Sequence, residues 1–562
     1  MKPLRLFTVR RSLFAVYCSL ITALFLAHTL FYYFALGTDA VDDAYISFRY
    51  AQNAIRGHGL FFNPGERVEG FTNFLWTALM LPLEGAHVDV GRASMLLGVL
   101  FALATLWLVM RFAKSVGAPR GVGWLAALLL AVDGSFALWA VGGLETPLFA
   151  FLIFAGALLY VREQASDKWQ VTGDKARLTS HVSRFTSLVT RHFPLSGIFF
   201  ALAAMTRPEG AMIFALTVAH QAAWRLLTEH RLCTFRDLSR IFAFAALFAP
   251  YWLGRWWYYK SFLPNSFHAK VSASGPTAQI ERGWNHLAQF MQVHLGWLIT
   301  LPPVAGVARD MWQVTRDAAI VSRVTCHVSR AFWTTYFAAL IIPYGAYIVY
   351  VGGDWSVGRF FVPLLAPFYL LFATGVVEVW QWLVDRFFVR ESQRDLQSQR
   401  MDANKISANS RYSRILSLAL AALIFVSSSW FGEYGIYIRG FDAAKATEAR
   451  VTMGKWLHTH VPRGTFIAVD AAGQVPYFSE LPAIDMFGIN DLHIGRLQVA
   501  TLGQGTPGHE KFDLVYVITR APEYVIIYGT ALDDMKEYER APIEWTNDVT
   551  LYKFLTLYRR KR

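Results

Sequence analysis

Charged residues are scarce in this chain of 562 residues: they make up 17% of it, whereas 54% of the residues are hydrophobic. A soluble domain usually carries roughly 25% charge, so the composition excludes an ordinary soluble protein. Cysteine is rarer still, with three residues. Cys18 lies in an apolar run, and Cys233 and Cys326 lie in basic segments. No disulfide framework is therefore indicated.

Two phosphate-binding motifs are also missing. The chain contains neither a Walker loop nor a strand-linked G-x-G-x-x-G, so the sequence indicates no nucleotide site. The net charge of +13 would suit a nucleic-acid partner, but the basic residues lie mostly in short segments between apolar runs. That distribution is the orientation signal of a membrane protein, and we expect no nucleic-acid partner.

Long apolar runs are abundant. The run from Leu13 to Leu36 contains no charge and follows Lys2, Arg5, Arg10 and Arg11. It is longer than the apolar region of a signal peptide and lacks a small-residue cleavage site, so we interpret it as a retained anchor. By the length needed to cross a bilayer, roughly 20 residues, the sequence predicts about eleven spans. They cover residues 13–36, 93–112, 121–139, 144–161, 194–206, 210–226, 241–259, 287–307, 331–351, 361–383 and 414–431.

Charge predicts the orientation of these spans. If the N-terminus is cytoplasmic, every cytoplasmic segment is basic, as the positive-inside rule requires. These segments are 111–120, 168–191, 225–240, 309–330 and 386–411. We therefore expect a multi-pass protein of the inner or plasma membrane, whose polar inserts 165–192 and 391–413 are solvated on the cytoplasmic side.

The opposite face collects clusters rich in glycine and proline with mixed charge. They are the first loop, about 37–92, and the segments 142–146, 206–210, 263–270 and 352–359. Their common side of the membrane predicts a single extracytoplasmic site built from many loops.

Residues 432–562 follow the last span and predict a soluble extracytoplasmic α/β domain, separate from a membrane domain over 1–431. An amphipathic helix is expected over 442–459. Strands are expected at 465–469, 514–518, 524–527 and 550–554. The fold class is thus an α-helical polytopic membrane protein with a C-terminal α/β domain.

Asp42 and Asp43 are the most informative residues of the first loop. Adjacent carboxylates at a membrane edge cost desolvation energy, which favours a function. One can serve as a general base for a sugar hydroxyl, and two can hold a divalent metal cation. The alternative is a helix cap before the run Ala44–Ala51, but one aspartate suffices for a cap. Glu69 is a second acid of the same loop, either part of the site or simply solvated.

The outward clusters also carry cations, which favours an anionic ligand. Arginine binds phosphate through its planar fork and lysine as a point charge. Each cation can equally contact lipid headgroups or pair with an acid of its own face. The candidate binding residues are Arg49, Glu145, Arg207, Glu209, His268, Lys270, Asp354 and Arg359. Among them His268 is a lone histidine, which is more often structural than catalytic.

The first loop resembles the terminal β-(1→2)-arabinofuranosyltransferases of actinobacteria. The resemblance rests on D-D-A-Y-I-S-F-R-Y-A at 42–51, G-H-G-L at 57–60, N-P-G-E-R-V-E-G at 63–70 and T-N-F-L-W at 72–76. Similar short motifs are G-L-E-T at 143–146, L-P-N at 263–265 and G-G-D-W at 352–355. These enzymes belong to the GT-C class, to which the aminoarabinose and protein-mannosyl transferases are more distantly related. The resemblance is weaker over 432–562.

The resemblance implies a polyprenyl-phosphate sugar donor, inverting transfer outside the membrane, and an acid of the first loop as base. Asp42 and Asp43 match that acid, and Glu69 lies where distant relatives carry a second one. We therefore expect a glycosyltransferase that moves arabinofuranose or another sugar to a glycan or lipid of the cell envelope. A flippase for a lipid-linked anion and a non-catalytic scaffold remain alternatives. A transporter would favour ionisable groups on broken helices at the membrane midplane and repeated halves, whereas these acids lie in loops.

Overall fold

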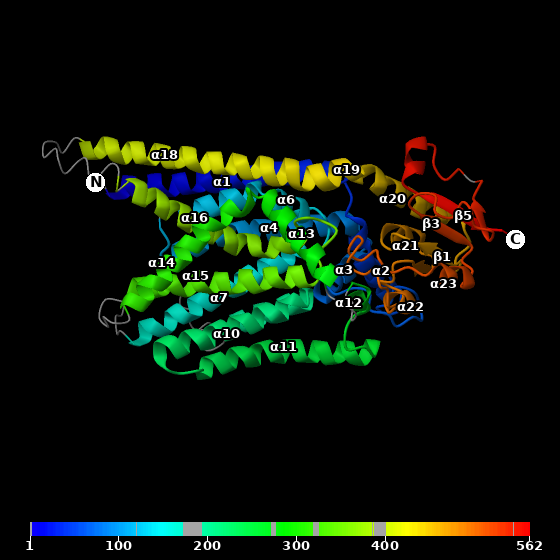
Figure 1. The fold of residues 1–562 in the computed structure, drawn as a ribbon, viewed down its shortest axis with the longest axis horizontal. Helices are drawn as coiled ribbons and strands as arrows, with labels where there is room; N and C mark the ends of the chain where they lie inside the picture. The colour runs from blue at the N-terminus through cyan, green and yellow to red at the C-terminus, as the bar shows by residue number, and fades with distance from the viewer. Residues whose placement is uncertain are drawn as a thin grey trace.

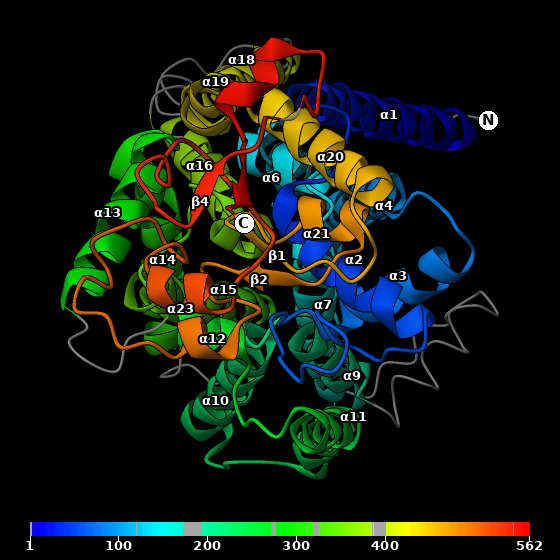
Figure 2. The ribbon, with the colours of Figure 1, turned by 90° about the vertical axis from the view of Figure 1, so that its right-hand side faces the viewer.

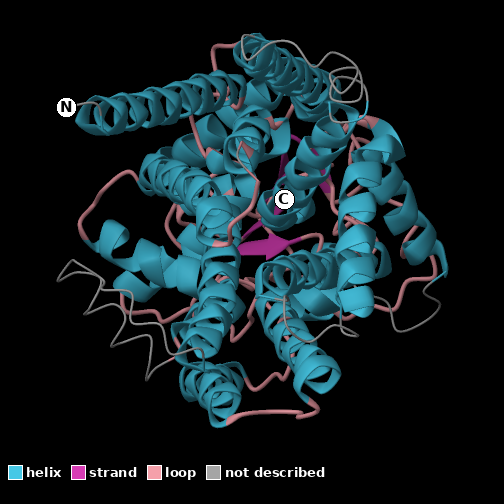
Figure 3. Ribbon diagram, turned by 90° about the vertical axis from the view of Figure 1, so that its left-hand side faces the viewer, coloured by secondary structure: helices cyan, strands magenta, loops and turns pink. Residues whose placement is uncertain are grey.

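The computed structural model describes residues 3–119, 121–171, 194–270, 277–317, 325–384, 386, 401–542 and 544–561. A bundle of long helices forms one end of the molecule, and a small sheet with its helices forms the other (Figure 1). The N-terminus lies at the helical end and the C-terminus at the sheet end (Figure 1). Viewed from the helical end, the helices are arranged around the centre of the molecule, and the strands lie behind them in the middle (Figure 3).

The helical part contains most of the chain. Its first half comprises α1 Pro3–Ala35, α2 Asp42–Ile55, α3 Phe74–Gly85, α4 Val90–Ser115, α5 Val122–Val132, α6 Gly134–Ala140, α7 Thr146–Val171 and α9 Leu195–Thr206. Its second half comprises α10 Glu209–Glu229, α11 Phe235–Tyr259, α12 Asn265–Lys270, α13 Thr277–Gln292, η1 Gly296–Thr300, α14 Leu301–Asp317, α15 Thr325–Tyr350, η2 Arg359–Phe361, α16 Val362–Val384, α18 Met401–Ile424, the π-helical segment η4 Phe425–Ile438 and α19 Arg439–Phe441.

Fewer helices pass as spans than the eleven expected. In the described part of the chain, six are long and apolar enough to cross a membrane, and eight if each of two bent pairs counts as one span. The α5–α6 pair bends by 65°, and the Asp133 carboxylate at the bend accepts a hydrogen bond from the Phe136 N–H at 2.9 Å. The predicted span 194–206 is the short helix α9. Most of the two polar inserts, 165–192 and 391–413, lies outside the described residues.

The C-terminal domain is an α/β module, as expected. It comprises α20 Ala443–His460, β1 Ile467–Val469, α21 Gln474–Ser479, β2 Ala483–Asp485, α22 Leu492–Gly495, α23 Leu514–Thr519, β3 Tyr524–Ile527, β4 Tyr538–Arg540, η5 Val549–Lys553 and β5 Thr556–Arg560. The sheet order is β2-β1-β3-β5-β4, with β1 parallel to β2 and β3 and with β5 antiparallel to β3 and β4. Ile467 and Val469 pack on the α20 side, and Ala468 on the other.

The structure confirms some of the expected elements and corrects others. The helix over 442–459 and the strands at 465–469 and 524–527 correspond to α20, β1 and β3. The expected strand at 514–518 is wrong: the segment is α23, because the Asp513 carboxylate caps it by accepting from the Tyr516 N–H. The expected strand at 550–554 is also wrong, since Asp548 caps the 3₁₀ helix η5 in the same way.

The first loop packs onto the C-terminal domain rather than lying free. Ile46, Tyr50, Phe62 and Phe71 share a buried core with the α20 side of the sheet. Viewed from the sheet end, α2 lies beside α21 near the middle of the molecule (Figure 2). The first loop and the C-terminal domain therefore form one cap over the helical bundle, and this cap positions α2.

Candidate active site

Polar side chains from distant segments meet in one cavity beneath this cap. Its volume is about 220 Å³, whereas one water molecule needs roughly 10–15 Å³ of such space, so it can admit a ligand. All five outward clusters expected from the sequence contribute: the first loop with Asp43, and the segments 144–145, 207–209, 263–270 and 353–360. Ile489 and Pro507 of the C-terminal domain close it from the other side.

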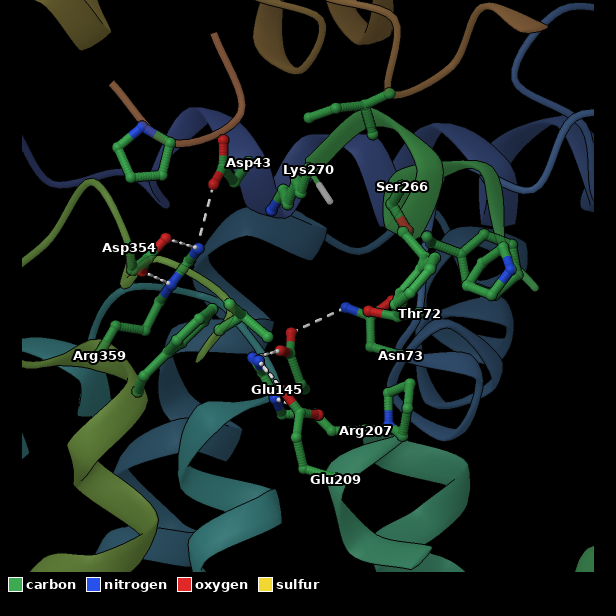
Figure 4. A pocket seen from close by; sticks show the side chains of 18 of the residues that line it. Asp43, Thr72, Asn73, Glu145, Arg207, Glu209, Ser266, Lys270, Asp354 and Arg359 are labelled. Atoms are coloured by element: carbon green, nitrogen blue, oxygen red, sulfur yellow. Dashed lines mark hydrogen bonds and ion pairs between the residues drawn. The ribbon is translucent and has the colours of Figure 1, made fainter. Parts of the chain in front are cut away.

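Asp43, in the first turn of α2, faces this cavity (Figure 4). One carboxylate oxygen, Oδ2, accepts hydrogen bonds from Arg359 Nη1 and Trp355 Nε1, each at 3.1 Å. The other oxygen, Oδ1, has no hydrogen bond to any described residue, and the side chain is 33% exposed. Burial alone would raise the pKa of Asp43, but the charges of Arg359, Lys270 and His509 hold it below its usual range. Asp43 is therefore an ionised carboxylate with one fixed oxygen and one open oxygen.

Asp42 points elsewhere. Its carboxylate accepts hydrogen bonds from the backbone N–H groups of Gly473 at 3.1 Å and Gln474 at 2.8 Å. Both amides lie at the start of α21, where unpaired N–H groups favour an acid. Burial raises the pKa of Asp42. Asp42 thus links α2 to the C-terminal domain. One aspartate of the pair was considered as a helix cap, and Asp42 has this role for α21 rather than for its own helix α2.

We expect Asp42→Ala to lower the free energy of unfolding by about 0.5–2 kcal/mol, the usual cost of losing such a cap. Asp42→Asn keeps a capping oxygen and retains most of that stability. Thermal unfolding of the purified proteins in detergent measures both changes. Equal loss in the two variants would contradict the capping role.

Arg359 is held by an acid of its own loop. Its guanidinium donates to both carboxylate oxygens of Asp354, at 2.5 and 2.7 Å, and the Arg359 side chain is 6% exposed. A buried carboxylate of η4, Glu433, supports this loop from below: it accepts from the hydroxyls of Ser356 and Ser135 at 3.2 and 3.1 Å. A Cβ on Gly358 would lie only 2.4 Å from Glu433 Oε1, so the tight fit requires glycine there. These contacts fix Arg359 against Asp43.

A second ion cluster forms the floor of the cavity. Arg207 binds Glu145 at 2.8 Å and Glu209 at 2.9 Å. Asn73 of the first loop donates to the other oxygen of Glu145 at 2.8 Å. Two carboxylates thus neutralise Arg207, which leaves it less able to attract an anion than its charge alone suggests.

Lys270, at the end of α12, lies beside Asp43 (Figure 4). Within the described part of the chain its ammonium forms no ion pair. The carboxylates of Asp354 and Asp43 lie near enough to attract it electrostatically. Burial, followed by the like charge of Arg359, lowers the pKa of Lys270. A bound anion would relieve that cost, so Lys270 is the best-placed cation for a phosphate.

Besides Asp42, three candidate residues lie outside the cavity. Glu69 forms a buried ion pair with Arg255 at 2.7 Å, and burial raises its pKa to about 7 despite that pairing. Arg49 is buried and donates to Gln52 and to the Leu481 carbonyl. The side chain of His268 does not reach the cavity either, and burial lowers its pKa. Arg49 joins the first loop to the C-terminal domain, whereas Glu69 ties the first loop to α11. Their direct roles in chemistry stay predictions that this geometry does not favour.

The acids of the cavity do not fit a shared metal ion. Asp42 and Asp43 diverge, as neighbours on a helix do, and Asp42 is engaged by backbone amides. The oxygens of Asp354, Glu145 and Glu209 are occupied by arginine or amide donors. Among the described residues, no group of three or more metal-binding side chains comes together. The divalent cation therefore stays a prediction from the sequence.

The structure adds site residues that the sequence did not single out. Trp355 donates to Asp43, and Arg282 lines the cavity while pairing with Glu510 at 2.7 Å. Trp355 belongs to the G-G-D-W motif, which was a usable signal. Arg282 and Glu510 lie 228 positions apart in the chain, so no local pattern could pair them.

The sequence comparisons agree with the resemblance expected from the first loop. The chain is 28% identical over 362 residues to a terminal beta-(1->2)-arabinofuranosyltransferase of Corynebacterium glutamicum. The match covers 61% of this chain and 49% of that protein, so the chain spans about half the length of the relative. A family model described as a domain of unknown function (DUF8728) matches residues 438–559, close to the C-terminal domain.

The structural comparisons show the fold. ArnT from Cupriavidus metallidurans, bound to undecaprenyl phosphate, superposes with a TM-score of 0.52 at 12% identity. Its apo state gives a TM-score of 0.54 at 11% identity, and both matches cover 95% of this chain and 97% of that chain. The chain therefore has the GT-C fold expected from the sequence.

Proposed function

We propose that this chain is a membrane glycosyltransferase that moves a sugar from a polyprenyl-phosphate donor to an acceptor of the cell envelope. The donor sugar is arabinofuranose or another pentose or hexose. The cavity would face the extracytoplasmic side, with the N-terminus in the cytoplasm. One observation carries the proposal. In a charged cavity an ionised aspartate, Asp43, lies beside Lys270, and neither the second oxygen of Asp43 nor the ammonium of Lys270 is bound by any described residue.

The reaction is a single displacement at the anomeric carbon. The acceptor oxygen forms a bond to that carbon while the bond from carbon to the phosphate oxygen breaks. The electron pair of the broken bond leaves on the phosphate, and the proton of the acceptor hydroxyl passes to Asp43 Oδ1. The configuration of the sugar inverts because attack and departure take place on opposite faces.

Charge stabilisation is the larger demand on the protein. Phosphate is a good leaving group, so no protein acid is needed, but negative charge develops on it as the bond breaks. Fixed cations in a cavity shielded from water stabilise such charge without reorganising. Lys270 meets the phosphate directly, and Arg359 fixes Asp43 while adding positive charge. The names of the relatives support the proposal: one is an arabinofuranosyltransferase and the other was solved with undecaprenyl phosphate bound.

The test is a donor panel. Purified protein in lipid vesicles is incubated with polyprenyl-phosphoryl arabinofuranose and with other pentose and hexose donors, together with envelope extract. Mass spectrometry then follows the release of polyprenyl phosphate and the mass gain of the acceptor. The proposal predicts release and transfer from at least one donor. If no donor is consumed, the glycosyltransferase function is wrong.

The pH dependence tests the pairing of Arg359 with Asp43. A base works only when deprotonated, so activity is lost as pH falls through its pKa. Because the pKa of Asp43 lies below its usual range, the wild-type rate should stay flat throughout the neutral range. Arg359→Gln removes the leading favourable charge, so the acid limb of its normalised kcat/KM profile should move to higher pH. An acid limb that stays in place or moves to lower pH would contradict the pairing.

A further inference from the structure

A line of aromatic rings leads away from Asp43 on the side that does not line the cavity. Trp355, which donates to Asp43, contacts Tyr437 with ring centres 4.9 Å apart. Tyr437 stacks on Phe441 at 6.2 Å, and Phe441 contacts Tyr528 at 6.4 Å. We call these four residues the aromatic track. It begins at the Asp43 carboxylate, whose Oδ2 accepts from Trp355, and crosses from η4 and α19 to the end of β3.

Exposure increases along the track. Trp355 and Tyr437 are half-buried, Phe441 is 37% exposed and Tyr528 is 60% exposed. Trp355 and Tyr437 are not among the described residues that line the cavity. Asp43 therefore contacts both the cavity and the first ring of the track.

A cation without a close partner flanks the track. Arg450 of α20 lies within electrostatic reach of Asp42, Asp470 and Tyr437. Throughout the described ranges its half-buried guanidinium makes no hydrogen bond or close ion pair. Asp470 lies at the end of β1 and accepts from the Tyr528 N–H at 2.5 Å. The rings thus run beside a guanidinium that makes no hydrogen bond to any described residue and a carboxylate that already accepts from the Tyr528 backbone.

This combination matches the chemistry of a sugar chain. The C–H faces of a sugar ring pack against the negative faces of aromatic rings, and its hydroxyls need donors and acceptors at the edge. Tyrosine and tryptophan are also common in the membrane interface, which accounts for an aromatic residue such as Phe441 at the end of a span. That explanation covers neither Tyr528, on the soluble sheet, nor Trp355, bonded to Asp43.

We infer that the aromatic track binds the acceptor, and that the acceptor is an extended glycan rather than a lipid. The inference rests on the proposed function and specifies its acceptor. With the phosphate beside Lys270 in the cavity, the acceptor hydroxyl must reach Asp43 from the opposite face of the donor sugar. A glycan lying along the track delivers its terminal hydroxyl to Asp43 Oδ1, which takes the proton.

The test offers both acceptor classes in one assay. Radiolabelled polyprenyl-phosphoryl sugar is mixed with envelope lipid extract and with oligosaccharides of graded length released from the same envelope by mild acid. For the wild type, label should enter the oligosaccharides, and longer chains should be used more efficiently than short ones. Tyr528→Ala and Phe441→Ala should raise the acceptor KM for long chains by roughly two- to tenfold per ring. Arg450→Gln should raise it as well.

Two controls separate stacking from general damage. Tyr528→Phe keeps the ring and should behave like the wild type. Phe512→Ala removes a ring of the same domain that is 45% exposed and lies outside the track, and it should keep the preference for long chains. The thermal shift produced by undecaprenyl phosphate, which reports the donor side, should be equal in all variants.

Two results would overturn the acceptor site. One is label in a lipid product other than the donor itself, and the other is an unchanged preference for long chains in Tyr528→Ala and Phe441→Ala. A wild type that releases no polyprenyl phosphate with any acceptor refutes the proposed function itself, which is a separate outcome.

Discussion

Asp43→Asn is expected to lower kcat by about 10²- to 10⁴-fold, the usual contribution of a general base. The amide oxygen of asparagine can still accept from Arg359 and Trp355, which both bind Oδ2, so the side chain should stay in place. What is lost is the ability of the open oxygen to take a proton. Initial rates of polyprenyl phosphate release measure the change, and thermal unfolding shows whether the variant is folded.

The neighbouring aspartate supplies the matched control. Asp42→Asn makes the same chemical change one residue away, on a side chain that binds backbone amides of α21. It should keep most of the wild-type rate. A folded Asp43→Asn protein that transfers sugar at the wild-type rate would show that another group accepts the proton.

Lys270→Gln is expected to reduce kcat by about 10²- to 10³-fold, since it removes a fixed positive charge from the place where the phosphate gains negative charge. Affinity for undecaprenyl phosphate should fall as well, because the product carries more charge on the phosphate than the donor does. The other cations that line the cavity, Arg207, Arg282 and Arg359, are already paired with carboxylates and cannot replace it. Steady-state kinetics and a thermal shift with undecaprenyl phosphate measure the two effects.

Lys445→Gln controls for the loss of one positive charge. Lys445 lies on α20 in exposed ion pairs with Glu448 and Asp548, and exposed pairs contribute little to stability. Its removal should leave both measurements unchanged. Equal effects of the two substitutions, or no effect of Lys270→Gln, would contradict the phosphate-binding role of Lys270.

The sequence could predict which segments form the site, because membrane topology alone assigns loops to a common face. All five outward clusters do line one cavity. Hydropathy also indicated the fold class and most of the helices of the bundle. These predictions succeed because they depend on composition and on local periodicity.

The sequence could not choose between Asp42 and Asp43. Successive residues of a helix point in different directions, and the direction that meets the cavity depends on where α21 and Arg359 lie, more than 300 positions away in the chain. The ion pair of Glu69 could not be predicted for the same reason, since its partner Arg255 is distant in sequence. The two wrong strands were predicted from apolar runs alone. Each run follows an aspartate, Asp513 or Asp548, that caps a helix, and this capping signal decides the structure.

The most direct test of the account measures polyprenyl phosphate released from a single donor by three purified proteins in the same vesicles. The donor is the one that the panel identifies, and the proteins are the wild type, Asp42→Asn and Asp43→Asn. The account predicts release by the wild type and by Asp42→Asn, and almost none by a folded Asp43→Asn protein. Release by Asp43→Asn that equals the wild type, or loss confined to Asp42→Asn, would contradict it.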